Sequence, residues 1–456
     1  MKTLLLICSF ITGLSTPAAA ADLMDIYQQA LDNDTLFKSA YDNYMSSTEA
    51  IPQARAALLP QLTVGSQAGR YTTDASLGSL GSSNTTYNYN AWQLTASQAI
   101  FNYQAWAQIA QAKASVKAAQ ATFNDAAQDL ILRTAKAYFD VLLSKDTLDF
   151  AEAKKRANKR QLDQATQRFQ VGVDTITSVY EAKAAYDQSI AQVISANNNQ
   201  TNQSENLRKL TNHVYSSVAR LRDNKIPLMK PEPNNVTQWI DTGIKQNYKL
   251  LAAKYNLEMA KDNVKALSAG NWPVVSIQSN TTQANNSVTN PSFFVPSKLT
   301  QADVALAVNF PIFQGGLVQS KTRQAQYDFQ SVSEKMEQAY REVVVNSRIA
   351  FNTITDGISK VTADKQTIIS QKNSLESTDA QFEVGTRTMV DVVNAQQRLF
   401  EAQEQLAQDQ YNLINSFLNL KYLAGSLNIN DIELVNSWLA TTRVNALAPF
   451  NPYHPK

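Results

Sequence analysis

The stretch QFEVGTRTMVDV, residues 381–392, places a single glycine inside a long run of helix-favouring sequence. The stretch RFQVGVDTITSV, residues 168–179, repeats the pattern with a shift of 213 residues. Without gaps, five positions are shared: Phe169 with Phe382, Val171 with Val384, Gly172 with Gly385, Thr175 with Thr388, and Val179 with Val392. A glycine that follows a helix lets the chain adopt a left-handed conformation and turn back. Each stretch therefore predicts the tip of a helical hairpin.

The same shift relates the two halves of the chain. Pro60 in LLPQLTVGS coincides with Pro273 in NWPVVSIQS, and Leu207 coincides with Leu420. A repeat of about half the chain indicates a tandem duplication rather than a short-period solenoid. We expect a signal peptide at 1–20, a first repeat at 21–223, a proline-rich linker at 224–235, a second repeat at 236–434, and a partly disordered C-terminal segment at 435–456.

The first twenty residues have the features of a signal peptide. Lys2 precedes the apolar stretch 4–14, and small residues at 18–20 form a cleavage site, so we expect cleavage after Ala20. Cys8, the only cysteine, lies in this segment. The exported chain would therefore have no disulfide, no cysteine nucleophile and no cysteine metal site.

Composition excludes several classes of protein. The formal net charge is +2 and gives no electrostatic case for nucleic acid as a partner. Only two histidines are present, and the chain has no Walker A loop, no GxGxxG and no HExxH motif. We expect no enzyme, no cofactor and no metal site. No run after Ala20 approaches eighteen apolar residues, so no transmembrane helix is expected.

Long helices dominate the expected structure. Residues 102–171 and 173–212 contain neither glycine nor proline, and the second half matches them at 317–384, with Gly357 as the one exception, and at 386–424. Apolar residues recur at spacings of three and four, which suits closely packed helices. One further helix is expected at the start of each half, at 23–58 and at 236–269.

Two pairs of alternating segments interrupt the helices. They span 61–71 with 86–101, and 274–283 with 300–313. Alternating segments of about ten residues, joined by polar loops, are typical of membrane β-barrels. Aromatic residues that suit a membrane–water interface gather near the loops: Tyr71, Tyr87, Tyr89, Trp92, Phe293 and Phe294. The alternative is a pair of exposed hairpins on a soluble protein.

The number of strands bears on assembly. Four strands cannot close a membrane barrel, and an open edge in lipid would leave backbone groups unpaired. Three chains would supply twelve strands, and a cyclic trimer closes naturally. The sequence thus predicts a shared barrel in a homotrimer.

The sequence resembles the TolC family of outer-membrane efflux proteins. The resemblance is carried by LLPQL with NWPVV, QAIF with FPIFQGG, QLDQATQRFQVG, and above all VGTRTMVDV, and it covers about residues 21–434. It implies a mixed fold: a homotrimeric, 12-stranded β-barrel in the cell outer membrane that continues into a 12-helix periplasmic tunnel. It also implies a passive exit duct for drug efflux or type I protein secretion, with a periplasmic adaptor and an inner-membrane RND or ABC transporter as partners.

The resemblance gives the hairpin tips two roles. Those that meet the adaptor correspond to Val171, Gly172, Val173, Val384, Gly385 and Thr386. Those that close the tunnel at the periplasmic gate correspond to Arg387 with Thr177, Ser178 and Phe382. The family has an aspartate at the position of Ser178 and a tyrosine at that of Phe382. Arg387 keeps its donor fork but loses a carboxylate partner; by hypothesis, Asp174 substitutes for it.

The constriction of the tunnel also departs from the family. The resemblance implies two lumenal aspartates three residues apart; the first matches Asp391, but the second position is Asn394. In a trimer, Asp391 would form a ring of three carboxylates that attracts cations. We expect a cation preference that is weaker than with two rings.

Two other classes stay open from the residues alone. One is a periplasmic coiled-coil scaffold without a pore, and the other is an adaptor-like hairpin protein. Both predict a soluble product, and neither explains two alternating strand pairs in each chain.

Overall fold

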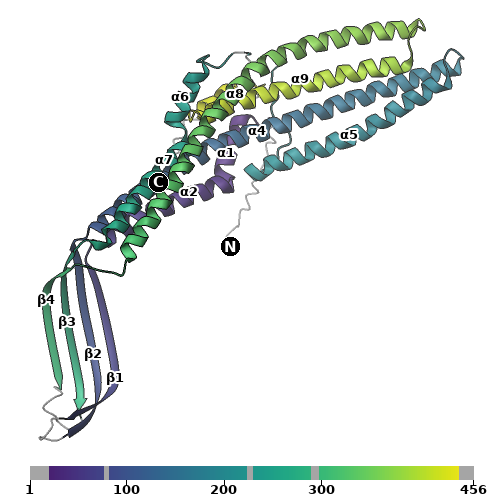
Figure 1. Cartoon of the computed structure of the whole chain (residues 1–456). Coiled ribbons are helices and arrows are strands. Elements are labelled where there is room, and N and C mark those ends of the chain that lie inside the picture. The colour runs from purple at the N-terminus through teal and green to yellow at the C-terminus, as the bar shows by residue number, and fades with distance from the viewer. Residues whose placement is uncertain (1–19, 77–81, 223–227, 229, 289–296, 441–456) are drawn as a thin grey trace, which may run out of the picture. The chain divides into compact units, whose positions relative to one another are not determined.

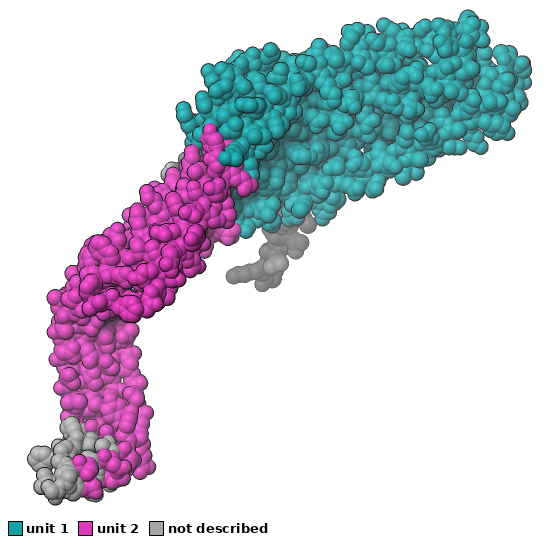
Figure 2. Space-filling view, viewed as in Figure 1, with its two compact units in different colours: residues 1–40, 124–248, 341–456 teal, residues 41–123, 249–340 magenta. Residues whose placement is uncertain are grey.

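The computed structural model describes residues 20–76, 82–222, 228, 230–288 and 297–440 (Figure 1). The chain divides into two compact units, one of residues 1–40, 124–248 and 341–456 and one of residues 41–123 and 249–340 (Figure 2). Several expectations fall on residues outside the described ranges: the signal peptide up to residue 19, part of the linker, Phe293 and Phe294, and the tail from residue 441.

The order of elements is the same in both halves of the chain. It runs α1 (Leu23–Asn33), α2 (Thr35–Thr48), α3 (Ala50–Ala56), β1 (Gln61–Ser76), β2 (Ser82–Phe101), α4 (Tyr103–Gln170), α5 (Ile176–Thr211), then α6 (Val236–Gln246), α7 (Tyr248–Ser268), η2 (Ala269–Asn271), β3 (Val274–Val288), β4 (Lys298–Asn309), α8 (Leu317–Glu383), α9 (Met389–Leu423) and α10 (Ile429–Asn436). The boundaries of the repeats and of the linker stay a prediction.

The four long helices have the expected extents. α4 has 68 residues and α8 has 67, and the return helices α5 and α9 have 36 and 35. The α4–α5 and α8–α9 hairpins run side by side (Figure 1), and the side-chain amide of Gln161 on α4 donates to Gln396 on α9 at 2.6 Å. None of the described helices is both long and apolar enough to cross a membrane.

The single helix expected at the start of each half was wrong. Asp34 separates α1 from α2 with φ −64° and ψ 118°, and Asn247 separates α6 from α7 with φ −61° and ψ 122°. These positions are again 213 residues apart. The Asp34 carboxylate accepts from the backbone N–H of Phe37 at 2.7 Å, so it caps the second helix. The first half has a further break, between α2 and α3, just before Pro52. Proline has no N–H to donate to the preceding turn, which weakens the helix there.

The strands form one antiparallel sheet in the order β1-β2-β3-β4. The register aligns Leu62 with Ala96, Ala96 with Ser279, and Ser279 with Val304 across all four strands. One face carries exposed apolar side chains, among them Leu62, Val64, Val304, Leu306 and Val308. The opposite face is polar: the side chain of Gln93 on β2 donates to Asn280 on β3 at 2.7 Å. β4 ends at Asn309, two residues before Pro311.

The largest hydrophobic core belongs to the unit that holds the hairpins. It gathers side chains from α1, α4, α9 and α10, including Ile26, Tyr138, Phe139, Leu418 and Ile432. The Tyr138 hydroxyl donates to the backbone carbonyl of Ala219 at 2.5 Å, which satisfies the one polar atom of a fully buried side chain. Burial raises the pKa of this hydroxyl, as does the charge of Asp22 and Asp25.

Candidate functional site at the hairpin tips

The two turns have the same backbone hydrogen bonds. At the first tip, Gly172 N donates to Phe169 O at 3.0 Å and Val173 N donates to Arg168 O at 2.9 Å. At the second, Gly385 N donates to Phe382 O at 3.0 Å and Thr386 N to Gln381 O at 2.9 Å. Gly172 has φ +76° and Gly385 has φ +79°, the left-handed conformation that ends a helix. The predicted hairpin turns are confirmed at both places.

Each return helix begins at a threonine cap. Thr175 caps α5 by accepting from Ser178 N at 3.4 Å, and Thr388 caps α9 by accepting from Asp391 N at 3.3 Å. Only the second cap is reciprocal, because the Asp391 carboxylate accepts in turn from Thr388 N at 3.0 Å. That arrangement is a capping box and holds the start of α9 more firmly than that of α5.

Arg387 lies just beyond the second turn and is 54% exposed. Its Nε donates to the side-chain oxygen of Gln381 at 3.1 Å, and its Nη1 lies 3.9 Å from Oδ1 of Asp391. The pKa of Asp391 is lowered, first by the hydrogen bond from the Thr388 backbone and then by that from its hydroxyl. Asp391 is therefore an anion over the whole neutral range.

Asp174 occupies the corresponding place at the first tip and is 14% exposed. Its Oδ1 accepts from the Ser178 hydroxyl at 2.7 Å and from Thr175 N at 2.7 Å. Its Oδ2 lies 3.7 Å from Nε of Arg168, close enough for an ion pair but too far for a hydrogen bond. The Asp174 carboxylate is thus held by groups of its own hairpin.

An apolar cluster joins the two hairpins behind the tips. Phe382 is only 4% exposed and packs in this cluster with Ala165, Ala182, Met389 and Val392. The guanidinium carbon of Arg168 lies over the Phe382 ring, 4.9 Å from its centroid. A ring face attracts a cation, so Arg168 of the first hairpin and Phe382 of the second hold the tips together.

Comparing matched positions reveals two residues, Arg168 and Gln381, that the sequence did not single out. Arg168 corresponds to Gln381 and Asp174 corresponds to Arg387 under the shift of 213. Each pair approaches across its turn: Arg168 Nε lies 3.7 Å from Asp174 Oδ2, and Arg387 Nε donates to Gln381 at 3.1 Å. The repeat alignment contained this signal: the two positions that flank each turn differ in charge between the halves.

The other predicted gate residues lie in different surroundings. Thr177 and Asn394 are exposed, and Ser178 is half-buried. Within the described chain, Arg387 forms no hydrogen bond or ion pair with Thr177, Ser178 or Asp174. Phe382 lies in the apolar cluster. Unlike a tyrosine, it has no hydroxyl that would need a hydrogen-bond partner there. The valines of the tips, Val171, Val173 and Val384, are all exposed.

Comparison with known proteins identifies relatives over nearly the whole chain. The family model described as outer membrane efflux protein matches residues 26–213 and again 239–426. The outer membrane protein TolC of Salmonella enteritidis is 36% identical over 462 residues, which cover 99% of this chain and 92% of that protein. The proteases secretion protein PrtF of Dickeya chrysanthemi is 25% identical over 436 residues, covering 94% and 93%.

A solved structure has the same fold. The outer membrane channel CmeC of Campylobacter jejuni superposes with a TM-score of 0.77 and covers 95% of each chain, at 16% sequence identity. The two stretches that the family model matches are offset by 213 residues: they begin at residues 26 and 239, and they end at residues 213 and 426.

Proposed function

This chain belongs to the outer membrane efflux protein family and lies in the outer membrane, and from that premise we propose that it is a passive exit duct. A relative named as an outer membrane protein TolC supports efflux, and a relative named as a proteases secretion protein supports protein secretion as a second cargo. We expect an inner-membrane transporter to supply the energy, and a periplasmic adaptor to connect that transporter to the duct.

The open four-stranded sheet carries the proposal. β1 and β4 lie at its two edges, and each has a row of backbone groups with no partner strand among the residues that the structure describes. The apolar face of the sheet, with Leu62, Val64 and Val304 exposed, suits lipid, and the polar face suits an aqueous lumen. Unpaired edges in lipid are costly, and pairing β1 of one chain with β4 of the next removes them. Three chains would make a barrel of twelve strands.

Cysteine cross-linking tests this assembly. Cys8 is the only natural cysteine and lies in the expected signal peptide, so introduced pairs would report without interference. Thr63→Cys on β1 would be combined in turn with cysteine at positions 303, 305 and 307 on β4. We expect one register to give a ladder that ends at three chains and collapses under reductant. Chains with Thr63→Cys alone are the control, and the absence of any three-chain product in every register would contradict the trimer.

The tips are the proposed gate and docking surface. Arg387 is exposed, and within the described part of the chain it makes one hydrogen bond and a long ion pair, so its charge is available to a neighbouring chain. The exposed valines Val171, Val173 and Val384 give an apolar contact surface to an adaptor. Asp391 and Asn394 would face the lumen in this arrangement, with a ring of three carboxylates favouring cations.

The substitution of Asp174 for the carboxylate that the family carries stays a hypothesis. In the single chain, Asp174 already bonds Ser178 and faces Arg168, so it would have to leave these partners to reach Arg387 of a neighbour. Asp174→Ala tests this. An opening frequency unchanged from the wild type would refute the substitution, whereas a more frequently open channel would support it.

A pore-less periplasmic scaffold is the remaining alternative. It would keep the hairpins and explain their length, but it would leave the exposed apolar face of the sheet in water. Fractionation distinguishes the two functions. A duct requires detergent for extraction from the outer membrane, and a scaffold is released with the soluble periplasmic proteins.

A further inference from the structure

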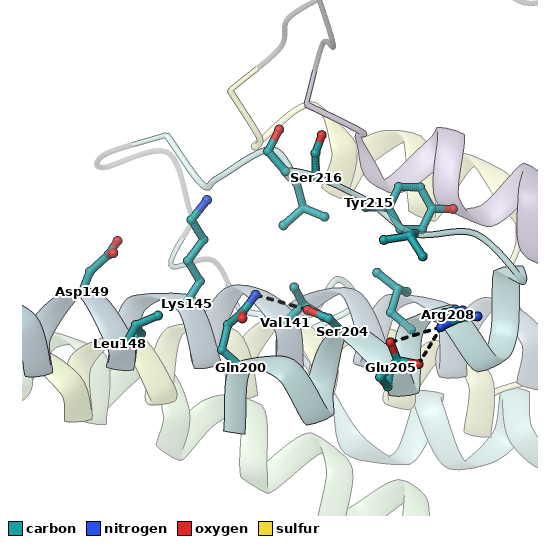
Figure 3. Close-up of a pocket in the computed structure, with 14 residues that line it drawn as sticks. Val141, Lys145, Leu148, Asp149, Gln200, Ser204, Glu205, Arg208, Tyr215 and Ser216 are labelled. Carbon is teal, nitrogen blue, oxygen red and sulfur yellow. Dashed lines mark hydrogen bonds and ion pairs between the residues drawn. The ribbon is translucent and has the colours of Figure 1, made fainter. Parts of the chain in front are cut away.

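Residues 214–217, at the start of the connection between α5 and α6, lie between two cavities. Residues 214–217 line a cavity of about 280 Å³ against α4 and α5 on one side (Figure 3). The same residues line a second cavity of about 410 Å³ against α1 on the other side. A segment with space on both sides depends on specific bonds rather than on packing.

Ala21 makes two backbone hydrogen bonds to this connection. Its backbone N–H donates to Ser217 O at 3.1 Å, and its carbonyl accepts from Ala219 N at 3.0 Å. The Tyr215 hydroxyl adds a bond of 2.9 Å to the side-chain oxygen of Gln29. Ala21 also lines the second cavity, together with Asp25, Asp32 and His213. The residue that anchors the connection is the one expected to begin the chain after cleavage.

The surroundings of Ala21 are rich in carboxylates and lack a cation. Within the described residues no lysine or arginine pairs with Asp22, Asp25 or Asp32, whereas Asp34 at the other end of α1 pairs with Arg133 at 3.0 Å. Burial raises the pKa of Asp25, and the neighbouring Asp22 raises it further. Asp22 N donates to Asp25 Oδ2 at 3.4 Å, and Ala21 lines the same cavity as Asp25 and Asp32.

We propose that cleavage after Ala20 creates an α-ammonium group at Ala21 that docks in this acidic cavity and locks the 213–218 connection onto α1. Hydrolysis adds one water across the Ala20–Ala21 peptide bond. The departing segment keeps the carboxylate, and the nitrogen of Ala21 becomes an ammonium with three N–H donors. One donor stays on Ser217 O, and the others face the carboxylates of Asp25 and Asp32, which line the same cavity. The inference rests on the expected signal peptide and is independent of the exit-duct function.

The charge pairing predicts a titration above neutral pH. An α-amino group titrates near pH 8 when free, and carboxylate partners raise its pKa. The contribution of the ammonium group to stability is complete below the pKa that the α-amino group has in the unfolded chain. That contribution is lost as pH rises through the pKa that the group has in the folded chain. Other ionisable groups lie near the cavity: Asp22, Asp25 and Asp32 on α1, His213 and Tyr215 on the connection, Tyr138 on α4, and Asp431 and Glu433 on α10. Of these, Asp431 pairs with Lys421 of α9.

Competitive acylation of the mature, detergent-extracted protein tests the proposal. Acetic anhydride would be reacted from pH 6.5 to 10, and the labelled N-terminal peptide would be quantified by mass spectrometry, which also identifies the first residue. We expect Ala21 as the first residue and an α-amino pKa about one unit above the ordinary value. Asp25→Asn, whose side-chain oxygen can still accept from Asp22 N, should return the pKa toward 8. Asp42→Asn on α2 is the matched control and should change nothing.

A second variant separates the charge from the anchor. One extra alanine after Ala20 moves the ammonium by one residue while the amide of Ala21 still donates to Ser217. The α-amino group of this variant should react with acetic anhydride like a free amine. The variant should also be cleaved by protease within 213–218 faster than the wild type at pH 7.5. An ordinary pKa in both the wild type and Asp25→Asn would overturn the proposal, as would a first residue other than Ala21. Equal cleavage of the extended and wild-type chains would also overturn the lock.

Discussion

The two hairpin tips share one backbone and differ in their charges. Both end a long helix with a left-handed glycine and restart at a threonine cap, with the same pattern of backbone hydrogen bonds. The first tip has Asp174 facing Arg168 at 3.7 Å, and the Asp174 carboxylate is 14% exposed. The second tip has Arg387 facing Gln381, and the arginine is half exposed.

This difference separates what builds a tip from what a tip can do. Glycine and threonine dictate the turn, and both halves of the duplication carry them. The flanking positions are not required by the turn, because the same turn forms with Arg–Asp and with Gln–Arg. The second tip therefore presents a cation that its own chain leaves available, and the first tip does not.

The largest expected effect concerns the aromatic residue before each turn. Phe382 is 4% exposed and Phe169 is 41% exposed, although they occupy matched positions. Phe382→Ala should cost about 3 kcal/mol of local stability because it empties the cluster that joins the hairpins, and Phe169→Ala should cost under about 1 kcal/mol. Hydrogen exchange of peptides spanning both tips measures this. Equal costs would mean that the cluster does not hold the tips together.

The glycines test the shared backbone. Gly172→Ala and Gly385→Ala should each destabilise their own tip by about 1 kcal/mol, since a Cβ at positive φ is strained while the space around both positions is open. Gly65→Ala in β1 also meets open space but at an ordinary φ, and serves as the control. Unequal effects at the two tips, seen by hydrogen exchange, would break the equivalence of the turns.

The fold was largely predictable from the chain, and the chemistry of the tips was only partly so. The absence of glycine and proline predicted α4, and their near-absence, with Gly357 as the exception, predicted α8, each to within a residue or two. The breaks at Asp34 and Asn247 were missed because capping side chains look like any polar surface residue in a helix pattern. Arg168 was missed because its role depends on Phe382, which is distant in sequence and adjacent only after the hairpins pack.

The threonine caps should differ in strength. Thr388→Ala removes a reciprocal capping box and should cost about 1 kcal/mol, while Thr175→Ala removes a single long hydrogen bond and should cost less. Exchange protection in the first turn of α9 and of α5 reports each loss. A Thr175→Ser variant, which keeps the hydroxyl, should behave like the wild type. A greater loss at Thr175 than at Thr388 would contradict the reciprocal cap.

The smallest expected effect is a pH dependence specific to the second tip. Because the pKa of Asp391 is lowered, its charge persists above the ordinary aspartate pKa and is lost only as pH falls through the lowered value. The cation preference of the channel should therefore survive below the pH at which an ordinary aspartate takes up a proton. Thr388→Val removes one of the lowering hydrogen bonds, so the preference should fade at a higher pH. Reversal potentials measured across a salt gradient give the ratio of cation to anion permeability. A pH profile of this ratio that is identical in Asp391→Asn and the wild type would exclude Asp391 from the constriction.

The central claim is that this protein is a gated duct that the second tip closes. Single-channel current through the purified protein in a planar bilayer tests it most directly, with wild type, Arg387→Ala and Asp174→Asn compared at one salt concentration. The account predicts discrete, cation-preferring steps that grow when Arg387 is removed and change less when Asp174 is neutralised. A folded, inserted protein whose current is the same in the wild type and Arg387→Ala, or that passes no current in either, would contradict it.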